Sequence, residues 1–372
     1  MASTDELKAL LGAPIPMARN TYLHFYNGGK LRGEFVGDVD PTDDYYSEEW
    51  FFSTNRAITP GRDNPPDKGF SRMTLPSGET VLLSALLEAF PDETLGSAHV
   101  ARHGTKLGLL MKMFDVGEGA HIPVHWHPSP EFAAKHLGSP YGKNESWILA
   151  ATRPGVEAWV GFTEDVGEKK FRRWMDEQDI AAMRAHMYRI EPKPGDVTFI
   201  RTGIVHSLGE GCCVLEPQEP SDWNILAEWE GYPYGKEDAH CGVGWDLALT
   251  AAEFTKLDKD YLYDYILRKP TVDRTEDGNE QVEYLPDEAR PYFWHNRYRV
   301  RTTMKTEPTH GYVGLIAHYG RGAVRGPWGD VAFRRGQGVF VPRCLAQDGF
   351  ELVNNGDDMF EVICSYPPVS ST

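Results

Sequence analysis

Short apolar or alternating runs, rich in Val, Ile, Phe and Trp, dominate the chain between Leu107 and Gln218. Turns that contain Pro and Gly, such as Arg153-Pro154-Gly155, separate these runs. Strands of this length divided by such turns are typical of an antiparallel sandwich or barrel. The pattern therefore predicts a protein dominated by β-structure. The runs are LGLLMKMFDV, HIPVHWH, SWILAAT, EAWVGF, VTFIRT and CCVLEPQ.

Helical patterns interrupt the strands at a few places. Ser3 and Glu6 have the spacing of a capping box, so we expect a short peripheral helix at the N-terminus. A proline follows each of the last two helical patterns, where it would end the helix, and Thr250 is placed to cap the final one. These further helices are expected at 82–90, about 177–189 and about 251–268.

The chain is long enough for two domains, with 372 residues of which 41% are hydrophobic. A strongly polar stretch at 271–289 reads as a linker or an exposed hairpin, and strand composition returns after it. The division that we expect is a helical extension at 1–20, a β domain with a helical insertion at 21–250, a helix and linker at 251–290, and a second, smaller β domain at 291–372.

Charge and composition restrict the partners and the location. The formal net charge of −17 would repel a phosphate backbone, and no basic stripe counters it, so nucleic acid is not an expected partner. The start of the chain lacks a basic and then apolar signal, and no run of eighteen apolar residues occurs. The five cysteines are odd in number and never spaced Cys-x-x-Cys, which favours a reducing compartment. We expect a cytoplasmic protein without membrane contact.

Two glycine-led histidine motifs carry the strongest chemical signal. In GAHIPVHWH, which ends at His127, side chains two apart on a strand leave the same face, so His125 and His127 point together and Trp126 points away. The second motif, GDVTFIRTGIVH, ends at His206, and Glu145 opens the strand SWILAAT. Three imidazoles and one carboxylate suit zinc, manganese, iron, cobalt or nickel. The sequence therefore predicts one divalent metal ion on these four residues.

The stretch HIPVHWHPSPEFAAKHLGSPYGKNESWIL resembles the metal-site segment of type I phosphomannose isomerases, and both histidine motifs resemble those of the cupin superfamily. YNGGKL, SEEWFFS, GDVTFIRTGIVHSLGEG and EPQEPSD are similar to family landmarks, in family order. The resemblance implies two cupin-type β-sandwich or barrel units with a few helices, the second unit degenerate. It also implies zinc as the metal, with His127, Glu145 and His206 as ligands and Lys143 facing the substrate.

Three departures from the family pattern bear on the substrate. His125 stands where the family usually has glutamine, and Leu226, four residues after Asp222, stands where it has a catalytic arginine. The following EWEGYPYGKED carries none of the family's basic residues. We therefore expect a preference for an unphosphorylated or weakly charged sugar over mannose 6-phosphate.

The expected function is that of a metal-dependent aldose-ketose isomerase that acts on a sugar or sugar phosphate through an enediol. This reaction needs a Lewis acid at the C1 and C2 oxygens and a base that moves a proton between the two carbons. Glu216 and Lys143 are candidates for the base, and a metal-bound hydroxide is a third. The expected partner is a small-molecule carbohydrate, and the candidate substrate-binding residues are Lys143, Trp50, Trp147, Arg201 and Asp222.

Two other functions stay open at this point. A different metal-dependent cupin enzyme, such as a lyase, an epimerase or an oxygen-using enzyme, is favoured by His125 and by the missing arginine. A non-catalytic carbohydrate-binding protein would close its metal with protein atoms, whereas a catalytic site keeps an exchangeable position.

Overall fold

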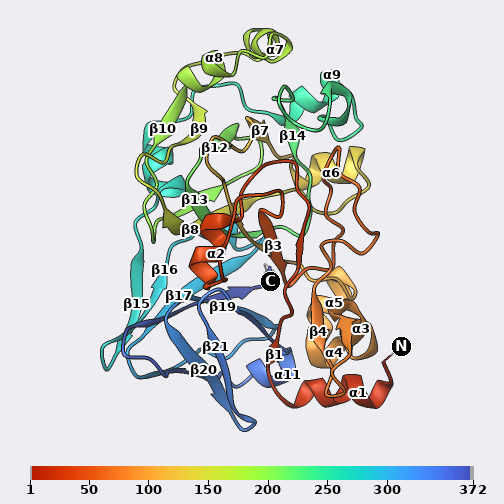
Figure 1. The fold of residues 1–372 in the computed structure, drawn as a ribbon, viewed down its shortest axis with the longest axis vertical. Helices are drawn as coiled ribbons and strands as arrows, with labels where there is room; N and C mark the ends of the chain where they lie inside the picture. Colours follow the sequence, from red (N-terminus) through yellow and green to blue (C-terminus); the bar gives the residue numbers. More distant parts are fainter. Residues whose placement is uncertain (1, 369–372) are drawn as a thin grey trace.

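The computed structural model describes residues 2–368 and is built mainly from antiparallel β-sheets (Figure 1). The strands that follow the polar stretch, drawn in blue, occupy the lower half of the molecule in Figure 1, and most of the earlier strands lie above them. No helix within the described residues is both long and apolar enough to span a membrane.

Two sheets form the upper β unit. Their inner faces pack together over a core that includes Trp147, Leu149, Val160 and Val214. In the five-stranded sheet the order is β10 (Met187–Ile190), β9 (Ala158–Phe162), β12 (His206–Leu208), β7 (His125–Trp126) and β14 (Ile225–Leu226). In the six-stranded sheet it is β11 (Val197–Ile200), β8 (Glu145–Thr152), β13 (Cys212–Gln218), β6 (Leu110–Asp115), β3 (Glu48–Phe51) and β2 (Thr21–Tyr22).

Two further sheets form the lower unit, around a core that includes Tyr298, Leu315, Val324, Leu352 and Phe360. The seven-stranded sheet runs in the order β1 (Ile15–Pro16), β22 (Gly338–Val341), β19 (Val313–Tyr319), β24 (Phe360–Tyr366), β17 (Trp294–Val300), β16 (Asn279–Glu283) and β15 (Thr271–Glu276). The four-stranded sheet runs in the order β18 (Thr303–Lys305), β23 (Glu351–Asn354), β20 (Arg321–Gly326) and β21 (Gly329–Arg334).

A shared core joins the two units. Met111 and Leu215 of the six-stranded sheet belong to the same hydrophobic cluster as Ile316, Phe340 and Ile363 of the seven-stranded sheet. The hydrophobic effect therefore holds the units together as well as each unit internally.

Helices cover the ends and edges of these sheets. The capping box predicted at Ser3 and Glu6 is present, and it begins α1 (Thr4–Ala9). The segment after it is not only helical, because β1 pairs with β22 of the lower unit. The other α-helices before residue 140 are α2 (Lys30–Val36), α3 (Leu83–Ala89), α4 (Pro91–Thr94), α5 (Ser97–His103) and α6 (Pro130–His136), and a hairpin of β4 (Arg72–Thr74) and β5 (Thr80–Leu82) precedes α3. The remaining short elements are η1 (Leu10–Gly12), η2 (Lys236–Asp238), η5 (Asp287–Ala289) and α11 (Arg343–Ala346).

The helix expected at 177–189 is wrong in extent. The chain instead forms α7 (Glu168–Asp176) and α8 (Ile180–Ala185), and then strand β10. Gln178 between the helices adopts a φ of 50°, which ends one helix, and the Asp179 side chain caps the next.

The helix expected at 251–268 is also wrong in extent. After α9 (Trp245–Ala248) and η3 (Leu249–Ala251), regular structure resumes only at α10 (Lys259–Tyr261), which continues into a π-helical turn, η4 (Leu262–Ile266). Asp258, and not Thr250, caps this helix. The residues between are bonded elsewhere: the backbone N–H of Glu253 donates to Gly203 and that of Leu257 donates to Phe162. Since these groups pair with other segments, a continuous helix cannot form.

The polar stretch at 271–289 forms a hairpin of β15 and β16 and not a free linker. Strand β16 pairs with β17, so the hairpin extends the seven-stranded sheet. The domain boundaries at 250 and 290 stay a prediction.

Candidate metal centre and substrate cleft

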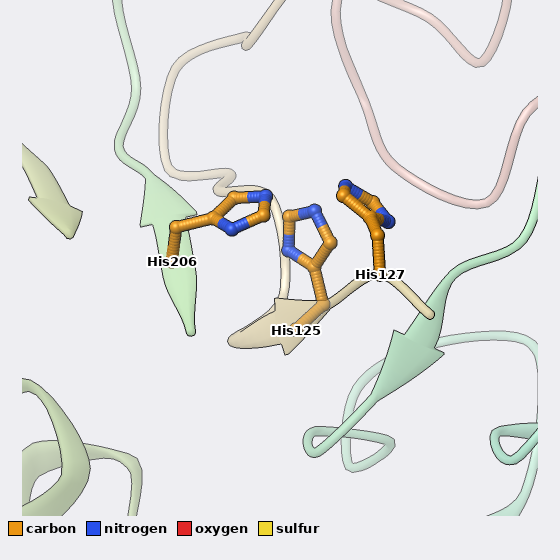
Figure 2. A group of neighbouring side chains, drawn as sticks. All are labelled: His125, His127 and His206. Atoms are coloured by element: carbon orange, nitrogen blue, oxygen red, sulfur yellow. The ribbon is translucent and has the colours of Figure 1, made fainter. Parts of the chain in front are cut away.

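Three histidines of the two sequence motifs meet inside the upper β unit (Figure 2). Strands β7 and β12 are antiparallel neighbours, and their register places His206 opposite His125. The ring centroids of these two residues are 4.0 Å apart, and that of His127 lies 4.9 Å from each. Potential ligand atoms of the three side chains all lie within 4.8 Å of one another. The structure thus brings together side chains that are up to 81 positions apart in sequence.

Hydrogen bonds fix which nitrogen of each imidazole faces the centre. In every case Nδ1 lies within hydrogen-bonding distance of a backbone carbonyl oxygen, which can only accept, so Nδ1 carries the proton. The neutral ring then keeps a free lone pair on Nε2, the atom that binds metal. The carbonyls are those of Pro123 for His125 at 2.7 Å, Trp223 for His127 at 2.9 Å and Ile204 for His206 at 2.8 Å.

Glu145 completes the group from the first position of β8. One carboxylate oxygen lies 3.0 Å from Nε2 of His127, and the other lies 3.3 Å from Nε2 of His206. The indole N–H of Trp147 donates to the carboxylate at 2.8 Å. Burial by itself raises the pKa of Glu145, but Lys143 and His127 outweigh burial and hold that pKa well below its usual range.

These four residues fit a divalent metal ion. Burial lowers the pKa of His127 to about 3, and burial together with His206 and His127 holds the pKa of His125 well below its usual value. The imidazoles are therefore neutral, as ligands must be. Nε2 of His206 is buried without a hydrogen-bond partner among the described residues, a costly state that a bound cation relieves. Three nitrogens and one carboxylate match the ligand preference of zinc.

A cleft opens beside the centre, and His125, Lys143, Glu145, Trp147 and Glu216 are among its lining residues. The Lys143 ammonium group donates to Glu145 at 2.7 Å and to Nε2 of His127 at 3.1 Å. Its nitrogen lies 3.8 Å from a carboxylate oxygen of Glu216. The predicted metal-binding and catalytic residues thus share one buried site.

The cleft also contains two charged residues, Lys112 and Glu48, that no sequence motif indicated. Lys112 on β6 lies 3.1 Å from Asp222 and 3.7 Å from Glu48 on β3. Burial lowers the pKa of Lys112, but Asp222 and Glu48 outweigh burial and raise it, so the ammonium stays charged. A lysine in the middle of the apolar run LLMKMF was the available signal, because a charge in a buried strand needs a partner.

His24, which belongs to neither histidine motif, also lines the cleft. Its Nε2 lies 3.1 Å from Glu48, which also accepts from the Tyr26 hydroxyl and the Trp50 indole, each at 2.7 Å. Trp50, predicted to contact substrate, is fully buried and is not among the residues that line the cleft. Trp50 therefore contacts Glu48, which lines the cleft, and does not line the cleft itself.

The structure does not bring Arg201, another predicted substrate-binding residue, into the cleft. Its guanidinium group pairs with Glu253, where one contact is 2.7 Å, and donates to the Tyr261 hydroxyl at 3.1 Å. Leu226 does line the cleft, and it pairs with His125 across β14 and β7. An apolar side chain therefore stands beside the metal ligands.

Comparisons with known proteins agree with this architecture, although no family model matches the chain. The mannose-6-phosphate isomerase of Streptococcus mutans is 22% identical over 362 residues, which cover 96% of this chain and 99% of that protein. The mannose-6-phosphate isomerase ManA of Bacillus subtilis is 27% identical over 169 residues, 44% of this chain and only half of that relative. A crystal structure of the mannose 6-phosphate isomerase from Bacillus subtilis superposes with a TM-score of 0.71 at 19% identity, covering 95% of this chain and 99% of the other. The chain has the fold of a phosphomannose isomerase.

This match confirms the cupin-type β units that the sequence resemblance implied. Another mannose 6-phosphate isomerase structure, which was solved with bound zinc and yttrium, matches with a TM-score of 0.68 at 14% identity, over 96% of this chain and all of that one. At such identities the likeness establishes the fold, while the side chains decide the chemistry. The present cleft has Lys143 beside the candidate ligands, and Leu226 lines it at the position where the sequence resemblance would place an arginine.

Proposed function

We propose that this protein is a metal-dependent aldose-ketose isomerase that acts on a sugar or sugar phosphate. The observation that carries the proposal is the junction of a four-residue metal site with a buried, charged cleft on a phosphomannose isomerase fold. The two relatives named above add support, since both are mannose-6-phosphate isomerases. We infer His125, His127, Glu145 and His206 as the ligands and zinc as the metal.

The bound metal would supply a Lewis acid for the C1 and C2 oxygens of the sugar. The residues around it orient the substrate. Lys143 projects beside the ligand atoms, where its ammonium group can donate to an oxygen of the reacting end as negative charge develops there.

Glu216 is the candidate for the group that moves the proton between C1 and C2. It is buried on β13, lines the cleft and lies 3.8 Å from Lys143. Burial and the neighbouring Glu145 raise the pKa of Glu216 to about 8, although Lys143 and Lys112 oppose them. A carboxyl group with such a pKa can take up and release a proton near neutral pH.

The test is an isomerisation assay on metal-free protein reconstituted with zinc, manganese, iron or nickel, using free and phosphorylated aldoses and ketoses. We expect conversion in both directions with at least one metal. Glu216→Gln keeps the shape of the side chain but removes the base, so kcat should fall by about 100-fold or more while metal content stays unchanged. Turnover with no substrate pair, or full activity in this variant, would contradict the respective assignment.

A further inference from the structure

The cleft adjoins an outer chamber of about 310 Å³, and Phe25, Asn224 and Leu226 line both. A substrate whose reacting carbons lie at the metal-binding residues would extend its far end toward this chamber. The charged residues there are all acidic, and no Lys or Arg is among the described residues that line it. They are Asp222, Glu237 and Asp238.

The lysines of the inner cleft are already paired with carboxylates. Lys112 lies between Asp222 and Glu48, at 3.1 and 3.7 Å, and Lys143 donates to Glu145 at 2.7 Å. Two cations on the neighbouring loop are bonded to backbone carbonyls. Arg62 donates to His24 at 2.9 Å, and Lys68 donates to Leu23 at 3.1 Å. None of these cations lines the outer chamber, so a phosphate group placed there would face three carboxyl side chains and no lining cation from the described part of the chain.

His24 presents a hydrogen-bond acceptor to the cleft. Its Nε2 lies 3.1 Å from the Glu48 carboxylate, which can only accept, so the imidazole proton is on Nε2. Its Nδ1 is then a bare acceptor, and this atom is buried without a hydrogen-bond partner among the described residues. The residue is 3% exposed and lines the cleft. A buried acceptor in this state lacks a donor, and a hydroxyl group of a bound sugar can supply one.

We propose that the substrate is an uncharged sugar, one of whose hydroxyl groups donates a hydrogen bond to Nδ1 of His24. The inference rests on the proposed function and narrows its substrate class. Phe25 adds an aromatic wall to both chambers, on which the apolar face of a sugar ring can pack. The relatives named for mannose 6-phosphate would differ from this protein in the charge that their clefts accept.

Calorimetric titration of the zinc-loaded protein with mannose, lyxose and mannose 6-phosphate at low ionic strength tests the substrate class. We expect a free sugar to bind at least tenfold more tightly than the phosphate ester, and to show the higher kcat/KM. Tighter binding of the ester, or binding of none of the three, overturns the inference. If a free sugar binds best but is not isomerised, the proposed function fails while the substrate class stands.

Two substitutions of His24 test the named contact. His24→Gln keeps a donor for Glu48 but has no acceptor where Nδ1 lies, so the Kd for the free sugar should rise about tenfold. His24→Asn places its carbonyl oxygen near the position of Nδ1, so it should retain more of the affinity. Metal content and the circular dichroism spectrum should match the native protein in both. Unchanged affinity in His24→Gln, with intact folding, overturns the His24 contact.

A charge reversal in the outer chamber gives a separate check that does not threaten the core. Glu237 has an exposed side chain, so Glu237→Lys should fold normally and lower the Kd for mannose 6-phosphate relative to mannose by several-fold. Glu177→Lys makes the same charge change at an exposed residue that lines neither chamber, and it should leave the ratio unchanged. Equal ratios in the two variants would show that the outer chamber does not discriminate by charge.

Discussion

At the scale of single residues, the metal site depends on three imidazoles whose Nδ1 atoms are all held by backbone carbonyls. His206 shows the dependence most clearly, because its buried Nε2 has no hydrogen-bond partner among the described residues. His206→Ala removes one of four ligands, so we expect the metal content to fall from about one per chain to near zero after dialysis. Plasma emission spectrometry measures the content. His310→Ala, at an exposed histidine outside the centre, is the matched control, and retention of full metal content by His206→Ala would refute the ligand assignment.

Much of this centre could be predicted from the sequence, because its signals are local. The two side chains of a His-x-His pair on a strand leave the same face, and each glycine-led motif ends at a candidate ligand histidine. The charged residues around the centre carry no such pattern. Glu48, Lys112 and Asp222 are more than 60 positions apart in sequence and meet only through the pairing of β3 with β6 and the return of the chain after β13. Arg201 was predicted to enter the cleft and does not. Its partner Glu253 lies 52 residues away in sequence and holds it outside the cleft.

At the scale of elements, Gln178 joins the helical insertion to the segment that follows β14. Its side-chain amide donates to the carbonyls of Met175 and Ala227, and its carbonyl oxygen accepts the N–H groups of Trp229 and Glu230. The φ of 50° is therefore held by four hydrogen bonds that the sequence pattern could not reveal. This is the physical reason why the single helix expected at 177–189 is two helices.

Gln178→Ala should lower the free energy of unfolding by about 2 kcal/mol, because four hydrogen bonds are lost and several backbone groups lose their partner. Urea titration followed by tryptophan fluorescence measures the change. Glu177→Ala, at the adjacent exposed position, provides the comparison and should stay within about 0.5 kcal/mol of the native protein. If the two variants are equally stable, the side-chain bonds of Gln178 contribute nothing to the native state.

At the scale of the whole molecule, the β architecture and the second β unit follow from the alternation of apolar and polar residues. The contacts that join the two β units do not follow from this alternation. Strand β1 has only two residues, too few to carry a period, yet it pairs with β22 more than 320 positions away. The cluster that unites Met111 and Leu215 with Phe340 likewise depends on which faces of two sheets meet. These long-range contacts are determined by the total apolar area that folding buries, and no short stretch of sequence predicts them.

The lower unit contains a partly buried ion cluster that should make the molecule sensitive to acid. Glu361 on β24 lies 3.1 Å from Arg299 and 3.8 Å from Arg297 on β17, and 3.2 Å from His318 on β19. Arg299 also pairs with Glu280 on β16 at 2.6 Å. Burial alone raises the pKa of Glu361, but His318 and Arg297 outweigh burial and lower it to about 2.

A carboxyl group whose pKa is lower in the folded state stabilises that state when it is ionised. Its contribution is present above the unfolded pKa of about 4.5 and is lost as the pH falls toward about 2. Glu361→Gln removes this contribution, so the native protein should exceed the variant by up to about 3 kcal/mol at pH 6, and the difference should shrink below pH 4.5. Urea midpoints measured for both proteins from pH 6 to pH 3 test this. Burial lowers the pKa of His318 and Glu361 opposes that shift, so below pH 6.5 His318 destabilises the variant more than the native protein, an effect separate from the loss below pH 4.5. A difference that stays constant from pH 6 to pH 3 would show that Glu361 acts through packing and not through its charge.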